Sequence, residues 1–520
     1  MLRRLETPLG LKTNPFIFFV SAGIITAFVP VASLFNEPVS AFFGAITTWV
    51  ATHLGWFYIL SVTGLLLFLI WIALSRYGNI RLGGDDDRPE YGNLAWFTML
   101  FAAGIGTILM FWGVAEPISH FGNPPRGDVE PQSVAAAKQA MQITLYHFAL
   151  HTWTIFALPG LALAYFIYRH RLPPRISSMF YPVLGRRIYG PIGWIIDIVA
   201  VVGTMFGVAT SLGLGTLQIN SGLHHLIGLP NTVTAQVGII TVITLAATAS
   251  VALGLDRGIR RLSEINISLA VLLLLFVFVA GPTVFLLKGM VQTAGDYLDN
   301  LIHWAFWNDA YGRTGWQRQW TVFYWAWTIS WAPFVGIFIA RISRGRTIRE
   351  FVGGVLFAPV LFSIVWFCIF GLSAIDIELW GRGGLVEQVD EDVAIALFSL
   401  LQHYPMAQLT SGLSVLIVVI FFATSADSAS LVMDMLSSGD VTESPTRQRV
   451  FWALGGGAVA CSLLVLGGFG ALQNVITTLG LPFCMLLVFM ALMLARAVRR
   501  DYRGAALSGE DTGRTTTPSG

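Results

Sequence analysis

The stretch FYWAWTISW, residues 323–331, carries aromatic rings at a spacing that could bind a cation. On an α-helix, at about 100° per residue, Phe323, Trp327 and Trp331 form a stripe about 80° wide, whereas Trp325 points the other way. The electron-rich faces of such rings attract a quaternary ammonium group, and each desolvated contact contributes ~1–2 kcal/mol. The stripe therefore predicts one wall of a site that holds positive charge without a carboxylate.

A second aromatic cluster occurs in LYHFALHTWTIF, residues 145–156. Phe148, Trp153 and Phe156 fall within an arc of about 140° on a helical wheel. Two aromatic faces from two helices could close a box around a cation. The alternative is a packing cluster or an aromatic belt at the membrane interface, where Trp and Tyr are common.

Five ionisable side chains stand inside apolar stretches or near their ends, where buried charge is costly and a functional role is the default hypothesis: Glu116, His147, His151, Asp197 and Asp427. Glu116 lies near the end of one stretch, and His147 and His151 lie in another. The two histidines have the i, i+4 spacing of a helical metal pair, but HFALH lacks the intervening glutamate of a zinc hydrolase motif. We therefore expect hydrogen-bonded structural histidines at these positions.

The elements that position these residues must lie in a membrane, because 55% of the 520 residues are hydrophobic and only 12% are charged. Crossing the hydrocarbon core takes about 20 apolar residues. Such runs predict an all-α protein with twelve spans, near residues 15–35, 53–75, 94–118, 141–168, 191–222, 232–254, 262–287, 321–340, 351–375, 408–436, 450–470 and 473–498.

The distribution of basic residues predicts the orientation of the chain. Most of the 31 Lys and Arg residues fall in the N-terminus and in alternate loops, and short cytoplasmic loops collect these residues. We expect both termini on the cytoplasmic side of a bacterial-type inner membrane. The expected organisation is a cytoplasmic N-terminus at 1–13, a twelve-helix domain at 14–500 and a short disordered cytoplasmic tail at 501–520. The net charge of +2 gives no support for a nucleic-acid partner.

Two spans contain residues that interrupt helices. The third span has Gly104 and Gly106 in its middle, and the eighth has Pro333 and Gly336. Backbone freed by such breaks is tolerated at membrane depth where it lines a cavity or is buried in protein; the alternative is close packing or a kink.

The third and eighth spans are five apart, so the chain enters them from opposite sides of the membrane. This is the arrangement expected of an inverted repeat of five plus five helices, at about 94–287 and 321–498, after two extra helices. Carriers place their substrate site at such a junction.

The run FYWAWTISWAPFVGIFIARISRGRTIREF resembles the signature of the betaine/choline/carnitine transporter (BCCT) family. Supporting segments, among them NPFIFFVSAG, LYHFALHTW and FFATSADS, follow in the family's order along nearly the whole chain. The resemblance implies a leucine-transporter-like core of ten helices, a homotrimer, and alternating-access transport of solutes that carry trimethylammonium or related onium groups.

The same resemblance implies the substrate site. Its members are the aromatic box, a residue on the cytoplasmic exit path (Phe323) and small residues beside the box: Phe148, Trp153, Phe156, Trp327, Trp331, Phe323, Thr328, Gly104 and Gly106. Many glycine betaine carriers of the family have Trp at Thr328, Trp at Phe148 and Tyr at Phe156. Losing one ring of a cation box costs ~1–2 kcal/mol, roughly tenfold in affinity, so the onium class is expected and the particular substrate stays open.

A coupling ion is also implied by the resemblance. One sodium site of the family would use the carbonyl oxygens of Ala102, Ile105 and Phe421 and the hydroxyls of Thr424 and Ser425. Hard oxygen ligands of this kind suit Na⁺, and a broken helix supplies free carbonyls. No organic cofactor is expected.

The residue at position 108 separates the coupling modes. Proton-driven relatives tend to carry Asp where this chain has Ile108, which cannot titrate. Sodium-coupled import of zwitterionic glycine betaine is therefore favoured, because a net cation such as choline gains more from a counter-charge. An H⁺-coupled carrier of choline, carnitine, dimethylsulfoniopropionate or ectoine remains the alternative.

Two other classes of protein are less favoured. A channel or membrane sensor would usually show repeated pore loops or rings of like charge. An enzyme would need a nucleophile and a base facing one cavity, and Ser425 with Asp427 lacks a histidine. No catalytic residue is expected.

Overall fold

The computed structural model describes residues 13–104, 106–253, 256–438 and 445–513, and regular structure in these ranges is helical apart from one isolated bridge between Arg81 and Thr347. The elements, in chain order, are α1 (Pro15–Leu34), α2 (Asn36–Leu74), η1 (Arg76–Asn79), α3 (Asn93–Gly104), α4 (Thr107–Gly122), α5 (Val134–Phe148), α6 (Leu150–Ala164), η2 (Tyr165–Arg169), η3 (Ile176–Phe180), α7 (Tyr181–Leu184), η4 (Gly185–Tyr189), α8 (Pro191–Ile227), α9 (Val233–Leu253), α10 (Asp256–Ala280), α11 (Thr283–Phe306), α12 (Trp316–Gln319), α13 (Thr321–Ile342), α14 (Ile348–Trp380), α15 (Leu385–Glu391), η5 (Val393–Ile395), α16 (Ala396–Leu401), α17 (Ala407–Ser438) and α18 (Thr446–Gly513).

The predicted all-α membrane fold is confirmed. Within the described ranges, ten helical segments are long and apolar enough to cross a membrane. The third predicted span is divided between α3 and α4, each short, and α18 runs through the last two predicted spans with non-helical backbone at Gly467 and Gly468. The count of twelve and the inverted repeat stay predictions.

Local sequence explains where key helices begin. At the start of α1, the Asn14 side chain accepts hydrogen bonds from the N–H groups of Phe16 and Ile17. At the start of α14, Thr347 and Glu350 form a capping box. Both devices satisfy N–H groups that the first helical turn leaves free.

The predicted interruption in the third span is present. Helix α3 ends at Gly104, and α4 begins at Thr107 after extended backbone at Gly106. Ile105 lies outside the described residues.

The prediction of an interruption in the eighth span was wrong, because α13 continues through Pro333 to Ile342. Gly336 instead permits close packing: a Cβ there would stand 3.1 Å from the backbone nitrogen of Gly160 on α6.

A further break, which the sequence did not indicate, divides the fourth span. Ala149, with φ −105° and ψ −117°, separates α5 from α6. The break leaves the N–H of Leu150, at the start of α6, without a carbonyl of its own helix. This N–H donates instead to the hydroxyl oxygen of Tyr297 on α11 at 3.3 Å.

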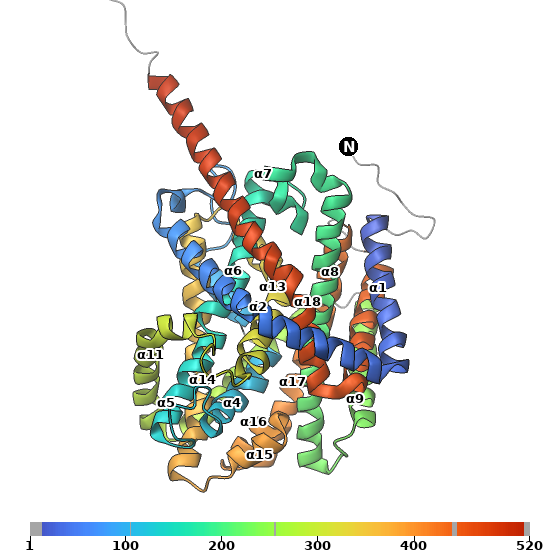
Figure 1. The fold of residues 1–520 in the computed structure, drawn as a ribbon, viewed down its shortest axis with the longest axis vertical. Coiled ribbons are helices and arrows are strands. Elements are labelled where there is room, and N and C mark those ends of the chain that lie inside the picture. Colours follow the sequence, from blue (N-terminus) through green and yellow to red (C-terminus); the bar gives the residue numbers. More distant parts are fainter. Residues whose placement is uncertain (1–12, 105, 254–255, 439–444, 514–520) are drawn as a thin grey trace, which may run out of the picture.

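The two ends of the molecule differ in the segments that they carry. In Figure 1 the start of α1, the end of α18 and α7 lie at one end, and α15 and α16 lie at the other. Between them, α13 packs against α6 and α8, and α2 crosses the bundle against α18. The interior where α4, α6, α8 and α13 meet holds the candidate site.

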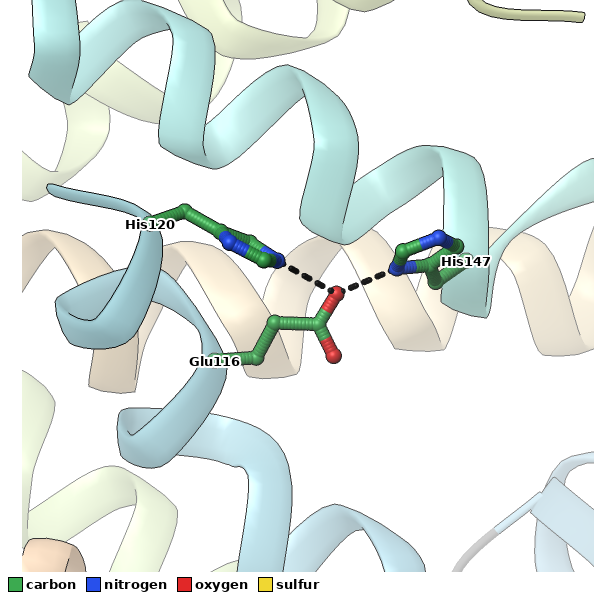
Figure 2. A group of neighbouring side chains, drawn as sticks. All are labelled: Glu116, His120 and His147. Atoms are coloured by element: carbon green, nitrogen blue, oxygen red, sulfur yellow. Dashed lines mark hydrogen bonds and ion pairs between the residues drawn. The ribbon is translucent and has the colours of Figure 1, made fainter. Parts of the chain in front are cut away.

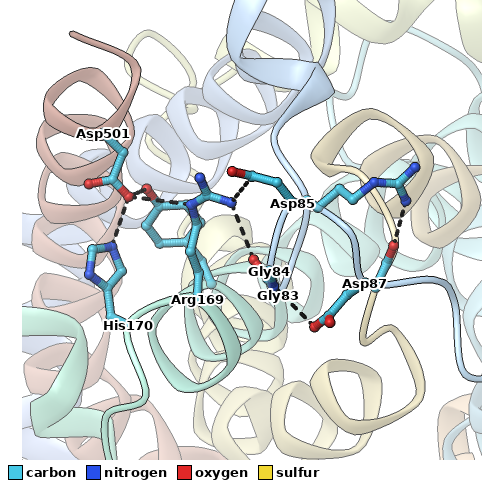
Figure 3. A network of polar contacts seen from close by, with 10 residues as sticks. Gly83, Gly84, Asp85, Asp87, Arg169, His170 and Asp501 are labelled. Atoms are coloured by element: carbon cyan, nitrogen blue, oxygen red, sulfur yellow. Dashed lines mark hydrogen bonds and ion pairs between the residues drawn. The ribbon is translucent and has the colours of Figure 1, made fainter. Parts of the chain in front are cut away.

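Polar contacts fasten α18 at the first of these ends (Figure 3). The Asp501 carboxylate lies 3.0 Å from Nε2 of His170 and 3.6 Å from Nε of Arg169. Arg169 also bridges to Asp85 at 2.8 Å and donates to the carbonyl oxygen of Gly83. The end of η2, the loop after η1 and α18 are therefore held as one unit.

Candidate functional site

Aromatic side chains surround a cavity of about 170 Å³ in the middle of the bundle, which we call the aromatic cavity. Its walls come from the start of α4, the end of α5, α6, α13, α14 and α17. The lining residues are Gly106, Thr107, Ile108, Leu109, Phe148, Thr152, Trp153, Phe156, Tyr324, Trp327, Thr328, Trp331, Phe334, Val335, Ser363 and Ser425. The structure thus brings the second predicted cluster, Trp327 and Trp331 of the first, and Thr328 around one space.

The two tryptophans of α13 are held by one hydroxyl. Trp327 Nε1 donates to Ser211 Oγ on α8 at 3.1 Å, and Trp331 Nε1 donates to the same oxygen at 2.9 Å. Trp331 Nε1 also donates to the carbonyl oxygen of Gly207 at 2.9 Å. Since a fixed ring retains its orientation toward the cavity, Ser211 is a positioning residue that sequence reasoning missed.

The rings of the second cluster converge although they do not share a helix. Phe148 ends α5, whereas Trp153 and Phe156 belong to α6. Phe148 stacks on Phe367 of α14 at a centroid distance of 4.5 Å, and Trp153 meets Phe156 edge to face at 5.5 Å. The single helical wheel assumed for these three residues was therefore wrong, because the chain turns at Ala149.

The lining suits a compact cation. Of the described residues that line the aromatic cavity, none carries a formal charge at neutral pH, while Thr152, Thr328, Ser363 and Ser425 supply hydroxyls. The volume slightly exceeds that of a ~150 Å³ engineered apolar cavity that accepts benzene. A trimethylammonium group can therefore be enclosed by ring faces in a site of low dielectric, where cation–π attraction is strongest.

Phe323 lies outside the lining. It is fully buried in the first turn of α13 and stacks on Trp327 at a centroid distance of 5.7 Å. Arg341, in the last turn of α13, and Arg344, in the loop that follows, stand at the other end of this helix. The predicted cytoplasmic exit role of Phe323 and the predicted cytoplasmic position of that loop cannot both hold, and both stay predictions; the structure shows Phe323 in contact with Trp327, a ring that lines the cavity.

The residues predicted to bind sodium are partly brought together. Of the predicted sodium ligands, Ser425 lines the aromatic cavity, as does Gly106 at the break before α4. Thr424 Oγ1 donates to the carbonyl oxygens of Ile420 and Phe421 at 2.9 and 3.2 Å, and a donating hydroxyl keeps lone pairs for a cation. Ala102 lies in α3, one turn or less from Gly104 at its end, and Ile105 is outside the described residues.

A larger cavity, of about 740 Å³, lies beside the aromatic cavity. We call it the vestibule; its lining includes Trp112, Trp320, Arg318 and Asp390. Trp112 meets Tyr324, which lines the aromatic cavity, edge to face at 5.2 Å. A layer of rings therefore separates the two spaces.

The predicted histidine pair is divided. His147 lies in the last turn of α5 and hydrogen-bonds to Glu116 and Thr321, whereas His151 lies on α6 with its ring stacked on that of Trp325 at a centroid distance of 5.9 Å. Both are fully buried. The hydrogen-bonded role expected for His147 is present, but neither ring nitrogen of His151 has a hydrogen-bond partner among the described residues.

These features define a class: a polytopic helical membrane protein with a solute-sized cavity beside a broken helix. Residues 16–503 match the family described as "BCCT, betaine/carnitine/choline family transporter". The chain belongs to this family and is a solute transporter, not an enzyme.

Three relatives illustrate the range of this family. The chain is 49% identical to the ectoine/glycine betaine/proline transporter EctP of Corynebacterium glutamicum, over 95% of this chain and 81% of the relative. It is 44% identical to a glycine betaine transporter of Acinetobacter baylyi, over 94% and 74%. It is 41% identical to a high-affinity choline transport protein of Escherichia coli, over 98% and 75%.

Proposed function

We propose that this transporter imports a zwitterionic onium solute, with glycine betaine favoured, by sodium-coupled symport and alternating access. The observation that carries the proposal is the aromatic cavity, in which Trp153, Trp327 and Trp331 surround a space whose described lining carries no formal charge. Ring faces would hold the onium group at ~1–2 kcal/mol for each desolvated contact.

The broken third span supports a zwitterion over a simple cation. Helix α4 begins at Thr107, and Gly106, Thr107 and Ile108 line the aromatic cavity. A helix N-terminus carries free N–H groups and a partial positive charge, which together attract a carboxylate. Glycine betaine would thus place its ammonium among the rings and its carboxylate at the start of α4.

One relative supports the choice of a zwitterion. EctP is named for ectoine, glycine betaine and proline, which are all zwitterions at neutral pH, and it is 49% identical to this chain. The runner-up is H⁺-coupled transport of choline, favoured by the choline transport relative and disfavoured by Ile108, which lines the cavity where a counter-charge for choline would stand.

Sodium as the coupling ion rests on the oxygen atoms at Phe421, Thr424 and Ser425 beside the broken helix. The proposal further includes both termini on the cytoplasmic side of a bacterial inner membrane and a homotrimer. The first of these is supported by the basic loops and by the start of α1 and the end of α18, which share one end of the molecule (Figure 1).

Uptake of labelled glycine betaine by proteoliposomes tests the proposal. We expect saturable uptake that requires an inward sodium gradient and persists without a pH gradient. Competition by unlabelled glycine betaine, choline, carnitine, ectoine and dimethylsulfoniopropionate then ranks the substrates, with zwitterions ahead of choline. Uptake driven by a pH gradient alone would favour the runner-up, and no saturable uptake of any onium solute would contradict the function.

A further inference from the structure

Three buried side chains between the vestibule and the aromatic cavity converge on one point (Figure 2). Glu116 and His120 lie one turn apart on α4, and His147 lies at the end of α5. Glu116 Oε1 stands 2.6 Å from His147 Nδ1 and 3.4 Å from His120 Nε2. One ligand atom from each residue lies within 4.8 Å of the other two.

This cluster is not a closed hydrogen-bond network. All three side chains are fully buried, yet His120 Nδ1 has no hydrogen-bond partner among the described residues, and His120 Nε2 has only the long 3.4 Å contact with Glu116. Buried polar atoms without partners are costly, by about 1–3 kcal/mol each. The atoms left over are those that could bind a ligand enclosed by the cluster.

From this geometry we propose that Glu116, His120 and His147 form a binding site for a divalent transition-metal ion of the zinc class. Two imidazoles and one carboxylate are a known donor set for zinc, with the fourth position left to water or another oxygen. Ligand atoms around a tetrahedral zinc ion stand about 3.3 Å apart at bond lengths of ~2.0–2.2 Å. The His120–Glu116 separation already matches, and the His147–Glu116 pair must open by roughly 0.7 Å.

Neighbouring residues fix the tautomer and the orientation of the proposed metal ligands. His147 Nε2 lies 2.9 Å from Thr321 Oγ1. When Nε2–H donates to this hydroxyl, Nδ1 is free to bind the metal, and such outer partners fix the tautomer and orientation of metal-binding histidines. The proton now shared by His147 and Glu116 would leave to solvent as the ion enters. Tyr324, whose ring stacks on His147 at 4.8 Å, has its buried hydroxyl beside the Glu116 carboxyl, where it could fill the fourth position.

The position of the site predicts its effect. The His120 ring lies 4.3 Å from that of Trp320, which lines the vestibule, and His147 stacks on Tyr324, which lines the aromatic cavity. A bound ion would join α4 to α5 inside the ring layer that a solute must pass. Zinc is therefore expected to lower the maximal uptake rate without competing with the solute.

The test uses the full chain in detergent, stripped of metal and titrated with ZnCl₂ by calorimetry. We expect one high-affinity ion per chain, at least tenfold weaker binding in His120→Gln and in Glu116→Gln, and unchanged binding in His303→Gln, a control at an exposed histidine. Titration of the wild type with CoCl₂ should give the intense visible bands of a four-coordinate ion, and His120→Cys should add a sulfur-to-cobalt charge-transfer band.

Other results would overturn the proposal. These are equal zinc affinity in the wild type and His120→Gln, loss of the ion in His303→Gln, or the weak visible absorption of six-coordinate cobalt. The cobalt spectrum of the wild type tests the metal site even if a variant fails to fold. None of these readouts requires solute transport, so the metal site and the proposed function fail separately.

Discussion

The indole N–H of Trp331 donates to Ser211 Oγ at 2.9 Å, which joins the cavity face of α13 to α8. The same oxygen accepts from Trp327 at 3.1 Å. Removing the hydroxyl leaves the Trp327 N–H, which is buried, without a partner, whereas Trp331 keeps the carbonyl oxygen of Gly207. Ser211 therefore controls the orientation of Trp327 above all.

Ser211→Ala is expected to raise the KM for glycine betaine about fivefold to tenfold, because a lost hydrogen bond in a buried site costs about 1 kcal/mol or more. Ser330→Ala is the matched control, since the Ser330 hydroxyl donates only within its own helix, to the carbonyl oxygen of Ala326. Uptake kinetics of the two variants in proteoliposomes check this. Equal KM values would show that Ser211 does not position the rings.

Trp331→Phe should weaken glycine betaine binding roughly fivefold to tenfold, because Trp offers the strongest cation–π surface and the smaller ring loses ~1 kcal/mol of it. Trp325→Phe on the same helix should leave affinity within about twofold, since Trp325 faces His151 and is not among the lining residues. Calorimetric titration measures both. An effect of Trp325→Phe as large as that of Trp331→Phe would place the solute elsewhere.

Two glycine variants distinguish a residue that matters for helix packing from one that matters for the solute site. Gly336→Ala is expected to destabilise the protein by about 1–3 kcal/mol and lower its melting temperature, because the added Cβ meets Gly160 at 3.1 Å and Pro159 at 3.2 Å. Gly106→Ala should keep the melting temperature, since the Cβ meets no atom within 4 Å, but it should reduce uptake because Gly106 lines the cavity. A melting-temperature loss confined to Gly106→Ala would contradict both assignments.

Thr424→Ala and Ser425→Ala are expected to raise the sodium concentration for half-maximal uptake about tenfold, since each removes an oxygen from the proposed ion site and interactions with charged groups are worth ~1.5–3 kcal/mol. Ser430→Ala, on the same helix, removes a hydroxyl that donates to the carbonyl oxygen of Asp427 and should leave the sodium dependence unchanged. If none of the three variants changed the sodium dependence of uptake, α17 would not contribute to the ion site.

The sequence allowed prediction of features that follow from regular helices. Because α13 is continuous, the i, i+4, i+8 spacing of Phe323, Trp327 and Trp331 correctly described one face, with Trp325 on the other. The break at Gly104–Gly106 was predictable because two glycines interrupt an apolar run. Family resemblance then connected these elements to one another and to the residues of the fourth span.

Other features depend on contacts between distant segments, so no local pattern indicated them. Ala149 is a strong helix former, and its break is stabilised by Tyr297, nearly 150 positions away. The role of Ser211 on α8 depends on hydrogen bonds from the indole groups of Trp327 and Trp331 on α13. His120 had one local signal, its i, i+4 spacing from Glu116, but its position beside His147 comes from the packing of α4 on α5.

The most direct test of an onium site built from aromatic rings is to compare glycine betaine with 3,3-dimethylbutanoate, an isostere that keeps the carboxylate but has an uncharged tert-butyl group in place of trimethylammonium. Both have the same shape, so their dissociation constants for the purified transporter differ through the charge. We expect glycine betaine to bind at least tenfold more tightly, and Trp331→Phe to reduce this ratio. Equal binding of the two compounds in the wild type would contradict a cation held by Trp153, Trp327 and Trp331.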